Sequence, residues 1–250
     1  MDWSKAKTPV YLLIIIALTI GFFVYSYDFD RNSVVYWDRT NPDKNKAMND
    51  NIKKLLGDQE NHIPKADIVC EINAGDLKAE NLYLDNPDCN IGASSSNSAW
   101  PNGRVWHVAA DSDIEIIGNI RSKGTLIVDF KGASGTVRIS TKSGESDSFR
   151  GDSSLGLMVI NGGNVEFTKD AEKYNGIIFA PGSSSSGGTV SFAEGGASIK
   201  IRGSIVADQI NFHPRTKDSR GYAVTIYTDA QILGSTLPGF ENIMSVIIYQ

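Results

Sequence analysis

One short pattern occurs three times in the chain: SGTVRIS at Ser134–Ser140, GGNVEFT at Gly162–Thr168 and GGTVSFA at Gly187–Ala193. In each copy a Gly precedes Thr or Asn, and Val, a variable residue and an apolar residue follow. Alternating apolar and polar residues after a turn residue indicate a short β-strand. A second group of glycines precedes other apolar runs and alternates with the first group along the chain: Gly124, Gly156, Gly176 and Gly203.

The region between Ile114 and Phe212 contains no helical periodicity. Without helices to connect parallel strands, βαβ units are excluded, and a sandwich, a barrel or a solenoid remains. Two alternating sets of Gly-headed strands are typical of a β-solenoid, in which each coil gives one strand to each face and Gly forms the corners. We therefore expect a right-handed parallel β-helix with roughly 20 to 30 residues per coil. An antiparallel β-sandwich is the alternative.

An uncharged apolar segment, Pro9–Tyr27, is close to the length that crosses a bilayer as a helix. Lys5 and Lys7 precede it and two Asp residues follow it, so the positive-inside bias predicts a cytoplasmic N-terminus and an extracytoplasmic body. The segment ends in Phe, Val and Tyr, whereas a signal-peptide cleavage site needs small residues. We therefore expect an uncleaved membrane anchor over residues 1–28.

Residues 29–60 are expected to form an extended stalk followed by a short helix. Pro42 suits the first helical position and Gly57 suits the C-terminal cap. The apolar residues of this segment recur at helical spacing and give the helix one apolar face: Met48, Ile52, Leu55 and Leu56. We expect this helix to cover the first edge of the β-solenoid ectodomain, which we assign to residues 61–250.

The chain has two cysteines, Cys70 and Cys89. An even number of cysteines outside the cytosol suggests a disulfide. Because the anchor places the body on the oxidising side of the membrane, we expect Cys70 and Cys89 to pair. In the chain-entropy model such a bond, closing a loop of about 20 residues, stabilises the fold by about 3 kcal/mol.

The composition and the motifs argue against several functions. A formal net charge of -5 and the lack of a basic run argue against a nucleic-acid partner, because phosphate binding needs concentrated Lys and Arg. The sequence contains no G-x-S-x-G, no phosphate-binding G-x-x-x-x-G-K and no H-E-x-x-H, and its three histidines lie in separate segments. We therefore expect neither an enzyme nor a cofactor or metal site.

Three acidic residues, Asp111, Asp113 and Glu115, carry the enzymatic alternative, which is a polysaccharide lyase or hydrolase. They alternate in sequence and would share one face of a strand, and glycoside hydrolysis requires paired carboxyl groups. The other interpretation is a solvated edge strand whose charges prevent aggregation.

Two tryptophans, Trp100 and Trp106, flank the dipeptide Asn102-Gly103. Asn-Gly between arms rich in Val and Trp predicts a tight β-hairpin. In a regular hairpin both indoles lie on one side and form a candidate surface for contact with a partner or a sugar. The other interpretation is that both tryptophans cap the end of the solenoid.

The C-terminal segment FENIMSVIIYQ carries no charge after Glu241. Uncharged, β-branched segments pair readily with exposed sheet edges. We expect this assembly tail either to lie against the solenoid or to pair with a neighbouring subunit, which would make the protein part of a polymer. Its central residues are Val246, Ile247, Ile248 and Tyr249.

The second half of the chain resembles the ectodomains of PilX-class pilus-assembly proteins and related minor-pilin-like surface proteins, over Gly156 to Phe240. The segments that carry the resemblance are GLMVINGGNVEF, NGIIFAPG, IKIRGSIVADQINF and IYTDAQILGSTLPGF. The resemblance implies an N-terminal membrane helix and a Gly-rich β-helical ectodomain that ends in a Tyr, Asp, Leu and Pro-Gly-Phe arrangement. The matching residues are Tyr227, Asp229, Leu233, Pro238, Gly239 and Phe240.

Type IV pilins also carry a Gly before the leader cleavage site and a Glu early in the mature helix. In this chain no Gly precedes Gly21 and no Glu precedes Glu60. A surface protein that stays in the membrane therefore fits better than a subunit of a pilus shaft.

Together these features predict a single-pass, cell-surface protein with a structural, adhesive or pilus-associated role. The expected partners are the membrane, other copies of the chain or pilus components, and a surface polysaccharide, but no nucleic acid. The alternatives are a polysaccharide-binding ectodomain, a carbohydrate-active β-helix and a cytoplasmic polymer-forming solenoid of the bactofilin kind. The orientation of the anchor disfavours the last of these.

Overall fold

The computed structural model describes residues 63–64, 69–93, 103–141, 153–182, 187–218, 221, 223–227 and 237–240. The chain divides into two units, Met1–Trp37 and Asp38–Gln250, and all described residues belong to the second. The predicted anchor, the stalk with its capping helix, Trp100 and the assembly tail lie outside the described residues. Within those ranges, no helix is long and apolar enough to cross a membrane.

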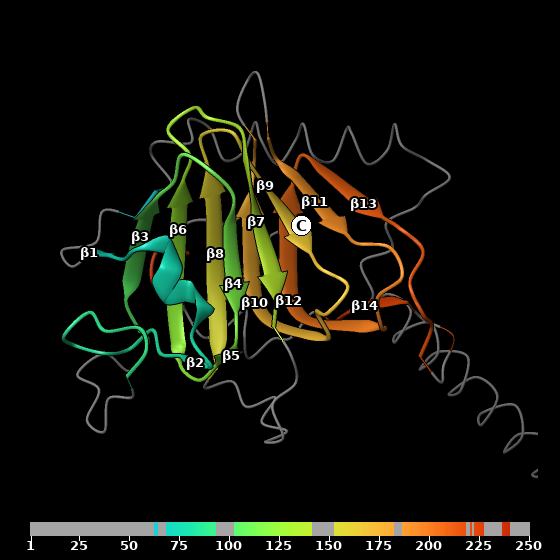
Figure 1. The fold of residues 1–250 in the computed structure, drawn as a ribbon, viewed down its shortest axis with the longest axis horizontal. Helices are drawn as coiled ribbons and strands as arrows, with labels where there is room; N and C mark the ends of the chain where they lie inside the picture. The colour runs from blue at the N-terminus through green and yellow to red at the C-terminus, as the bar shows by residue number, and fades with distance from the viewer. Residues whose placement is uncertain are drawn as a thin grey trace, which may run out of the picture. The chain divides into compact units, whose positions relative to one another are not determined.

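Two parallel β-sheets make up the described part of the chain (Figure 1). The seven-stranded sheet has the order β1 (Val69–Glu71), β3 (Val105–Ala109), β6 (Lys123–Asp129), β8 (Ser154–Ile160), β10 (Lys173–Ala180), β12 (Ile199–Ala207) and β14 (Val224–Tyr227). The five-stranded sheet has the order β4 (Ile114–Ile117), β7 (Gly135–Ser140), β9 (Gly163–Phe167), β11 (Thr189–Phe192) and β13 (Gln209–Phe212). The short strands β2 (Asn81–Leu82) and β5 (Asn119–Ile120) pair separately, and η2 (Ala74–Lys78) is a 3-10 helix.

The chain visits the two large sheets alternately from β3 to β14, and each return adds one strand beside the previous one. Register partners on successive coils lie about 20 to 30 residues apart in sequence, as in the row Val105, Thr125, Gly156, Ile177 and Ser204. This topology confirms a mainly β fold with parallel sheets, and it is consistent with a β-helix-like fold. Every strand pair in the described residues is parallel, so the antiparallel sandwich is wrong.

The interior between the two sheets is filled by apolar side chains that stack in rows from coil to coil. In the five-stranded sheet, Ile114, Val137, Val165 and Val190 are register partners and are all buried. The side chains between them along each strand point outward and are polar. The period of two predicted from the repeated sequence pattern is therefore the alternation between core and solvent.

An aromatic stack continues this interior toward the last coil. The rings of Phe167, Phe192 and Phe212 lie parallel with centroids 4.9 and 5.0 Å apart. Tyr174 meets Phe167 edge-on at 5.6 Å and donates its hydroxyl proton to the Leu155 carbonyl at 2.8 Å. Burial raises the pKa of Tyr174 well above its usual value, because the phenolate would lose its hydration.

The predicted role of the glycines is right for one set and wrong for the other. Gly135 and Gly163 are register partners at the starts of β7 and β9, and Gly188 immediately precedes β11, as expected for corners. The second set lies inside the strands of the seven-stranded sheet, where Gly176 and Gly203 pair with each other. These strands begin up to four residues before their glycines, so the Gly residues do not head them.

Candidate functional site

The first coil of the described chain closes one end of the stack. β1 pairs with β3, and η2 lies against β4, the edge strand of the five-stranded sheet. Lys78 of η2 and Glu115 of β4 form an ion pair at 3.1 Å. A charged element that covers an edge strand prevents pairing with other chains. In the described residues the cover is therefore η2, a segment that the sequence pattern had not singled out.

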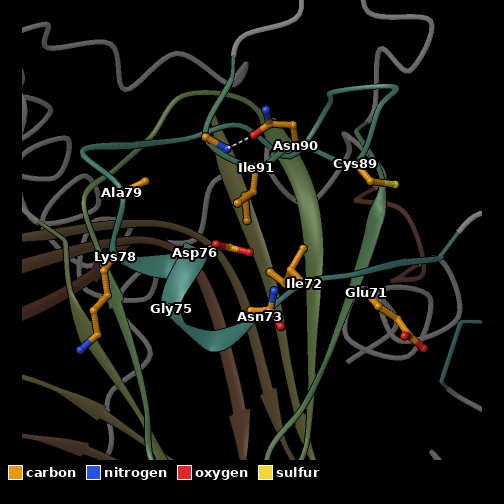
Figure 2. Close-up of a pocket in the computed structure, with 11 residues that line it drawn as sticks. Glu71, Ile72, Asn73, Gly75, Asp76, Lys78, Ala79, Cys89, Asn90 and Ile91 are labelled. Carbon is orange, nitrogen blue, oxygen red and sulfur yellow. Dashed lines mark hydrogen bonds between the residues drawn. The ribbon is translucent and has the colours of Figure 1, made fainter.

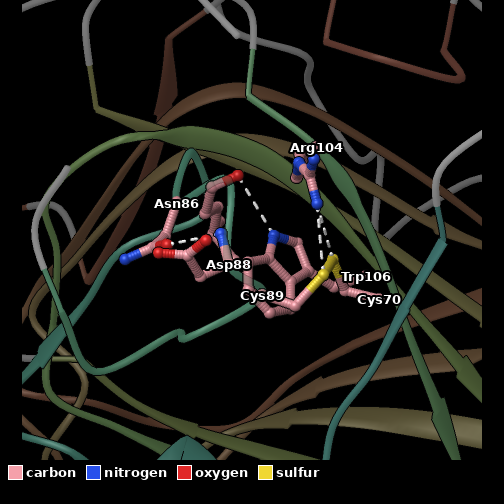
Figure 3. Close-up of a disulfide and its surroundings, with 7 residues drawn as sticks. Cys70, Asn86, Asp88, Cys89, Arg104 and Trp106 are labelled. Atoms are coloured by element: carbon pink, nitrogen blue, oxygen red, sulfur yellow. Dashed lines mark hydrogen bonds between the residues drawn. A yellow bond between two sulfur atoms is a disulfide. The ribbon is translucent and has the colours of Figure 1, made fainter. Parts of the chain in front are cut away.

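The predicted cysteine pair holds this first coil (Figure 3). The sulfur atoms of Cys70 and Cys89 lie at disulfide distance, and their Cα atoms are 5.6 Å apart. Arg104 is buried above them and its Nη1 donates to both sulfurs, at 3.3 and 3.1 Å. The geometry that pairing requires is thus present, and the link joins β1 to the loop that follows β2.

Trp106 does not belong to a contact surface. Its side chain is fully buried, and its indole Nε1 donates to the Leu84 carbonyl at 3.0 Å (Figure 3). The prediction of a surface for Trp106 is wrong, because β3 has neighbours on both sides and its side chains at this position point into the core. The interpretation as a cap of the solenoid end fits the position of Trp106 near the first coil.

The predicted hairpin around Asn102-Gly103 is also wrong. β3 pairs in parallel with β1 on one side and with β6 on the other, so neither edge is left for an antiparallel arm. Gly103 does adopt a positive φ of 76°, as the turn signal indicated. The turn therefore leads into a coil of the stack and not into a hairpin.

A groove of about 500 Å³ lies beside this first coil (Figure 2). The polar residues among those that line it are Glu71, Asn73, Asp76, Lys78 and Asn90. No aromatic side chain is among its described lining residues, and no group of three or more potential metal ligands occurs in the part of the chain that the structure describes. The groove thus offers hydrogen bonds and charge, without a ring on which a sugar would stack.

The three acidic residues of the enzymatic alternative lie at the outward face near β4. Asp113 pairs with Arg138 at 2.8 Å and accepts the Thr136 backbone N–H at 2.8 Å, while Glu115 pairs with Lys78. Asp113 above all, and then Glu166, raises the pKa of Arg138, because both carboxylates favour its charged form. Two of the three acids therefore contribute ion pairs between coils, as on a solvated edge.

The Pro-Gly-Phe segment of the resemblance has a defined position on the outer face of the seven-stranded sheet. The Thr125 hydroxyl donates to the Pro238 carbonyl at 2.6 Å. Phe240 is fully buried against Gly156, whose missing side chain leaves space for the ring. Leu237 and Phe240 complete a second apolar cluster on this face: Val105, Ile127, Met158, Ile160, Ile177 and Phe179. We call this position of residues 237–240 the outer-face seat.

Arg215 is a structural residue that sequence reasoning missed. It is 7 % exposed, and its five N–H groups donate to five backbone carbonyls at 2.9 to 3.4 Å. These carbonyls come from the turns after β9 and β11: Thr168, Lys169, Ala171, Ala193 and Ala197. Burial lowers the pKa of Arg215, yet a guanidinium keeps its proton in a protein. No sequence signal around Arg215 predicts this role.

Comparisons of the chain with protein-family models, with curated proteins and with solved structures find no match.

Proposed function

We propose that this protein is a membrane-anchored cell-surface component whose β-helical body has a structural, adhesive or pilus-associated role, including self-association into filaments. The observation that carries the proposal is the stack of parallel coils, closed at one end by a cysteine-linked coil. Architectures built from stacked coils commonly present extended surfaces to partners.

The outward face of the five-stranded sheet supports a scaffold role. Asp113, which immediately precedes β4, forms one ladder of charges with Arg138 of β7 and Glu166 of β9, and Asn164 accepts the Thr189 backbone N–H at 3.1 Å. Ladders of polar side chains between coils keep the face hydrated and hold neighbouring coils in register. The proposed handedness of the β-helix is right-handed, because connections between parallel strands of one sheet are right-handed in nearly all proteins.

The alternative function, recognition of a surface polysaccharide, rests on the groove beside the first coil. Asn73, Asp76 and Asn90 line the groove, and amide and carboxylate groups of this kind pair with sugar hydroxyls. The enzymatic version of this alternative is weaker, because Asp113 and Glu115 are already engaged with Arg138 and Lys78.

Protease digestion of intact cells tests the proposed topology. Trypsin added to intact cells, or to spheroplasts if an outer membrane is present, is expected to release fragments of residues 61–250, because the anchor places the body outside. In the same digest, run without reductant, the peptides with Cys70 and Cys89 are expected to be linked.

A cytoplasmic protein serves as the control for lysis in this digest. Protection of the body until the inner membrane is opened would contradict the membrane topology. Quantitative alkylation of both thiols without reductant would contradict the oxidised state of the cysteine pair.

A further inference from the structure

The last coil ends in a strand edge that no described strand covers. β13 pairs only with β11 and is the last strand of its sheet in the described residues. The Gln209 N–H donates toward β11, to the Gly188 carbonyl at 3.1 Å. Because backbone groups alternate in direction along a parallel strand, those of Ile210 and Phe212 point to the open side. Both side chains are only partly buried.

This end differs from the opposite end of the same sheet. There η2 lies against β4, and the ion pair between Lys78 and Glu115 fixes it. At β13, the outward residues Gln209 and Asn211 are uncharged, so no charge repels an incoming strand. Phe212 lies at the end of the aromatic stack, so an apolar side chain of the incoming strand can pack on its ring and continue the stack.

The assembly tail has the composition that this edge requires. Residues 244–250 are MSVIIYQ, without charge, Pro or Gly. Val246 and Ile248 share one face of a strand, and Ile247 and Tyr249 share the other, so either face presents apolar side chains to the core row.

Because residues 237–240 are fixed in the outer-face seat, the number of residues that follow Phe240 limits how far the tail can reach toward β13 of its own chain. Phe240 lies over Gly156 of β8, on the outer face of the seven-stranded sheet. The position beside β13 is three strand spacings further along the stack, about 14 Å, and one sheet separation away, about 10 Å. The path of about 24 Å runs around the packed core, whereas the six residues from Phe240 to Val246 span at most about 22 Å when fully extended. The strand at 246–249 therefore cannot lie along β13 of the same chain.

We infer that the tail strand of one copy pairs with the β13 edge of a second copy of this chain. The contact adds a sixth strand to the five-stranded sheet and covers Ile210 and Phe212. Each copy then has one donor tail and one acceptor edge, and such head-to-tail contacts generate open filaments unless the geometry closes a ring. This inference deepens the self-association proposed above and rests on it for its biological role.

The test uses two variants of the full-length chain in detergent, each with a different affinity tag. The donor-defective variant is V246K/I248K, which places two charges in the tail strand. The acceptor-defective variant is Ile210→Pro, which removes the N–H on the open edge and leaves the Gln209 bond to Gly188 in place. The control S245K/Q250K adds the same charge outside residues 246–249.

The wild-type chain and the S245K/Q250K control are expected to form multimers, and each defective variant alone is expected to be a monomer. V246K/I248K is expected to melt like the wild-type chain diluted to its monomeric state, because association itself stabilises the folded chain. Ile210→Pro is expected to melt a few degrees lower, because the Ile210 side chain packs against the core. Mixing the two variants is expected to give one-to-one dimers and nothing larger, because only one intact donor and one intact acceptor are present. Light scattering and two-tag purification measure this.

Three results would overturn the inference. If V246K/I248K assembles like wild type, the tail is not the donor, and the proposed self-association stands without this contact. If V246K/I248K stays unassociated and melts at least several degrees below the wild-type chain diluted to its monomeric state, the tail packs on its own chain. If the wild-type chain is a monomer at every concentration, self-association itself is wrong.

Discussion

Replacing Arg215 with Met is expected to lower the free energy of unfolding by about 3–5 kcal/mol. The guanidinium donates to five carbonyls in the turns after β9 and β11, and Met of similar length offers no donor. Each carbonyl left without a partner in a buried site costs about 1–3 kcal/mol, and water entering the loosened turns recovers part of the loss.

Denaturant unfolding followed by circular dichroism measures this effect. Arg215→Lys is expected to lose less, since an ammonium keeps three of the five donors. Lys217→Met is the matched control, because Lys217 is an exposed cation of the same segment and its removal should change stability by less than about 0.5 kcal/mol. Equal effects of Arg215→Met and Lys217→Met would show that the carbonyl contacts contribute little.

Replacing Gly203 with Ala is expected to destabilise the fold by at least about 3 kcal/mol or to prevent folding. Gly203 has a φ of 136°, and a Cβ built there overlaps the backbone carbonyl of Gly176 on the neighbouring strand. Backbone cannot move aside as a flexible side chain does, so the register between β10 and β12 would have to change.

Substitutions at two other glycines separate the cost of steric overlap from the cost of the backbone conformation in Gly203→Ala. Gly195 has a φ of 75° and open space around its Cα, so Gly195→Ala is expected to cost only about 1 kcal/mol from the backbone conformation. Gly75 has open space and an ordinary φ, so Gly75→Ala should be nearly neutral. Thermal melts of the three variants measure the series, and a Gly203→Ala protein as stable as Gly195→Ala would contradict the packing of β12 on β10.

The repeated pattern predicted the five-stranded sheet well because its strands are short and buried on one face only. Alternation in TVRI, NVEF and TVSF reports directly which residues point inward. The close approach of corner glycines was also readable, since Gly135 and Gly163 stack in register.

The seven-stranded sheet was harder to predict because both of its faces are apolar in the middle. β8 is buried along its whole length, so its sequence gives no alternation from which to place the strand start. The outer face is covered by Leu237 and Phe240, which lie about 80 residues further along the chain than Gly156. Such distant contacts leave no local signal.

The hairpin and the contact surface were wrong because both were inferred from a local turn, whereas the position of the following strand is set by contacts with distant parts of the chain. Asn102-Gly103 indicated a tight turn correctly, but the pairing partner of the following strand is set by the stack and not by the turn. The position of Trp106 beside that turn allowed either a contact surface or a cap of the solenoid end, and Trp106 is buried because β3 is an interior strand. Arg215 gave no signal because its partners are backbone carbonyls, which every sequence contains.

Electron microscopy of immunogold-labelled intact cells tests the central proposal, a surface-exposed and self-associating body, most directly. With antibodies against residues 61–250, the account predicts gold particles on the outer surface, arranged in rows or along filaments, and dispersed single particles for V246K/I248K. Gold that appears only after the inner membrane is permeabilised would contradict the surface location, and dispersed particles for the wild-type chain would contradict self-association.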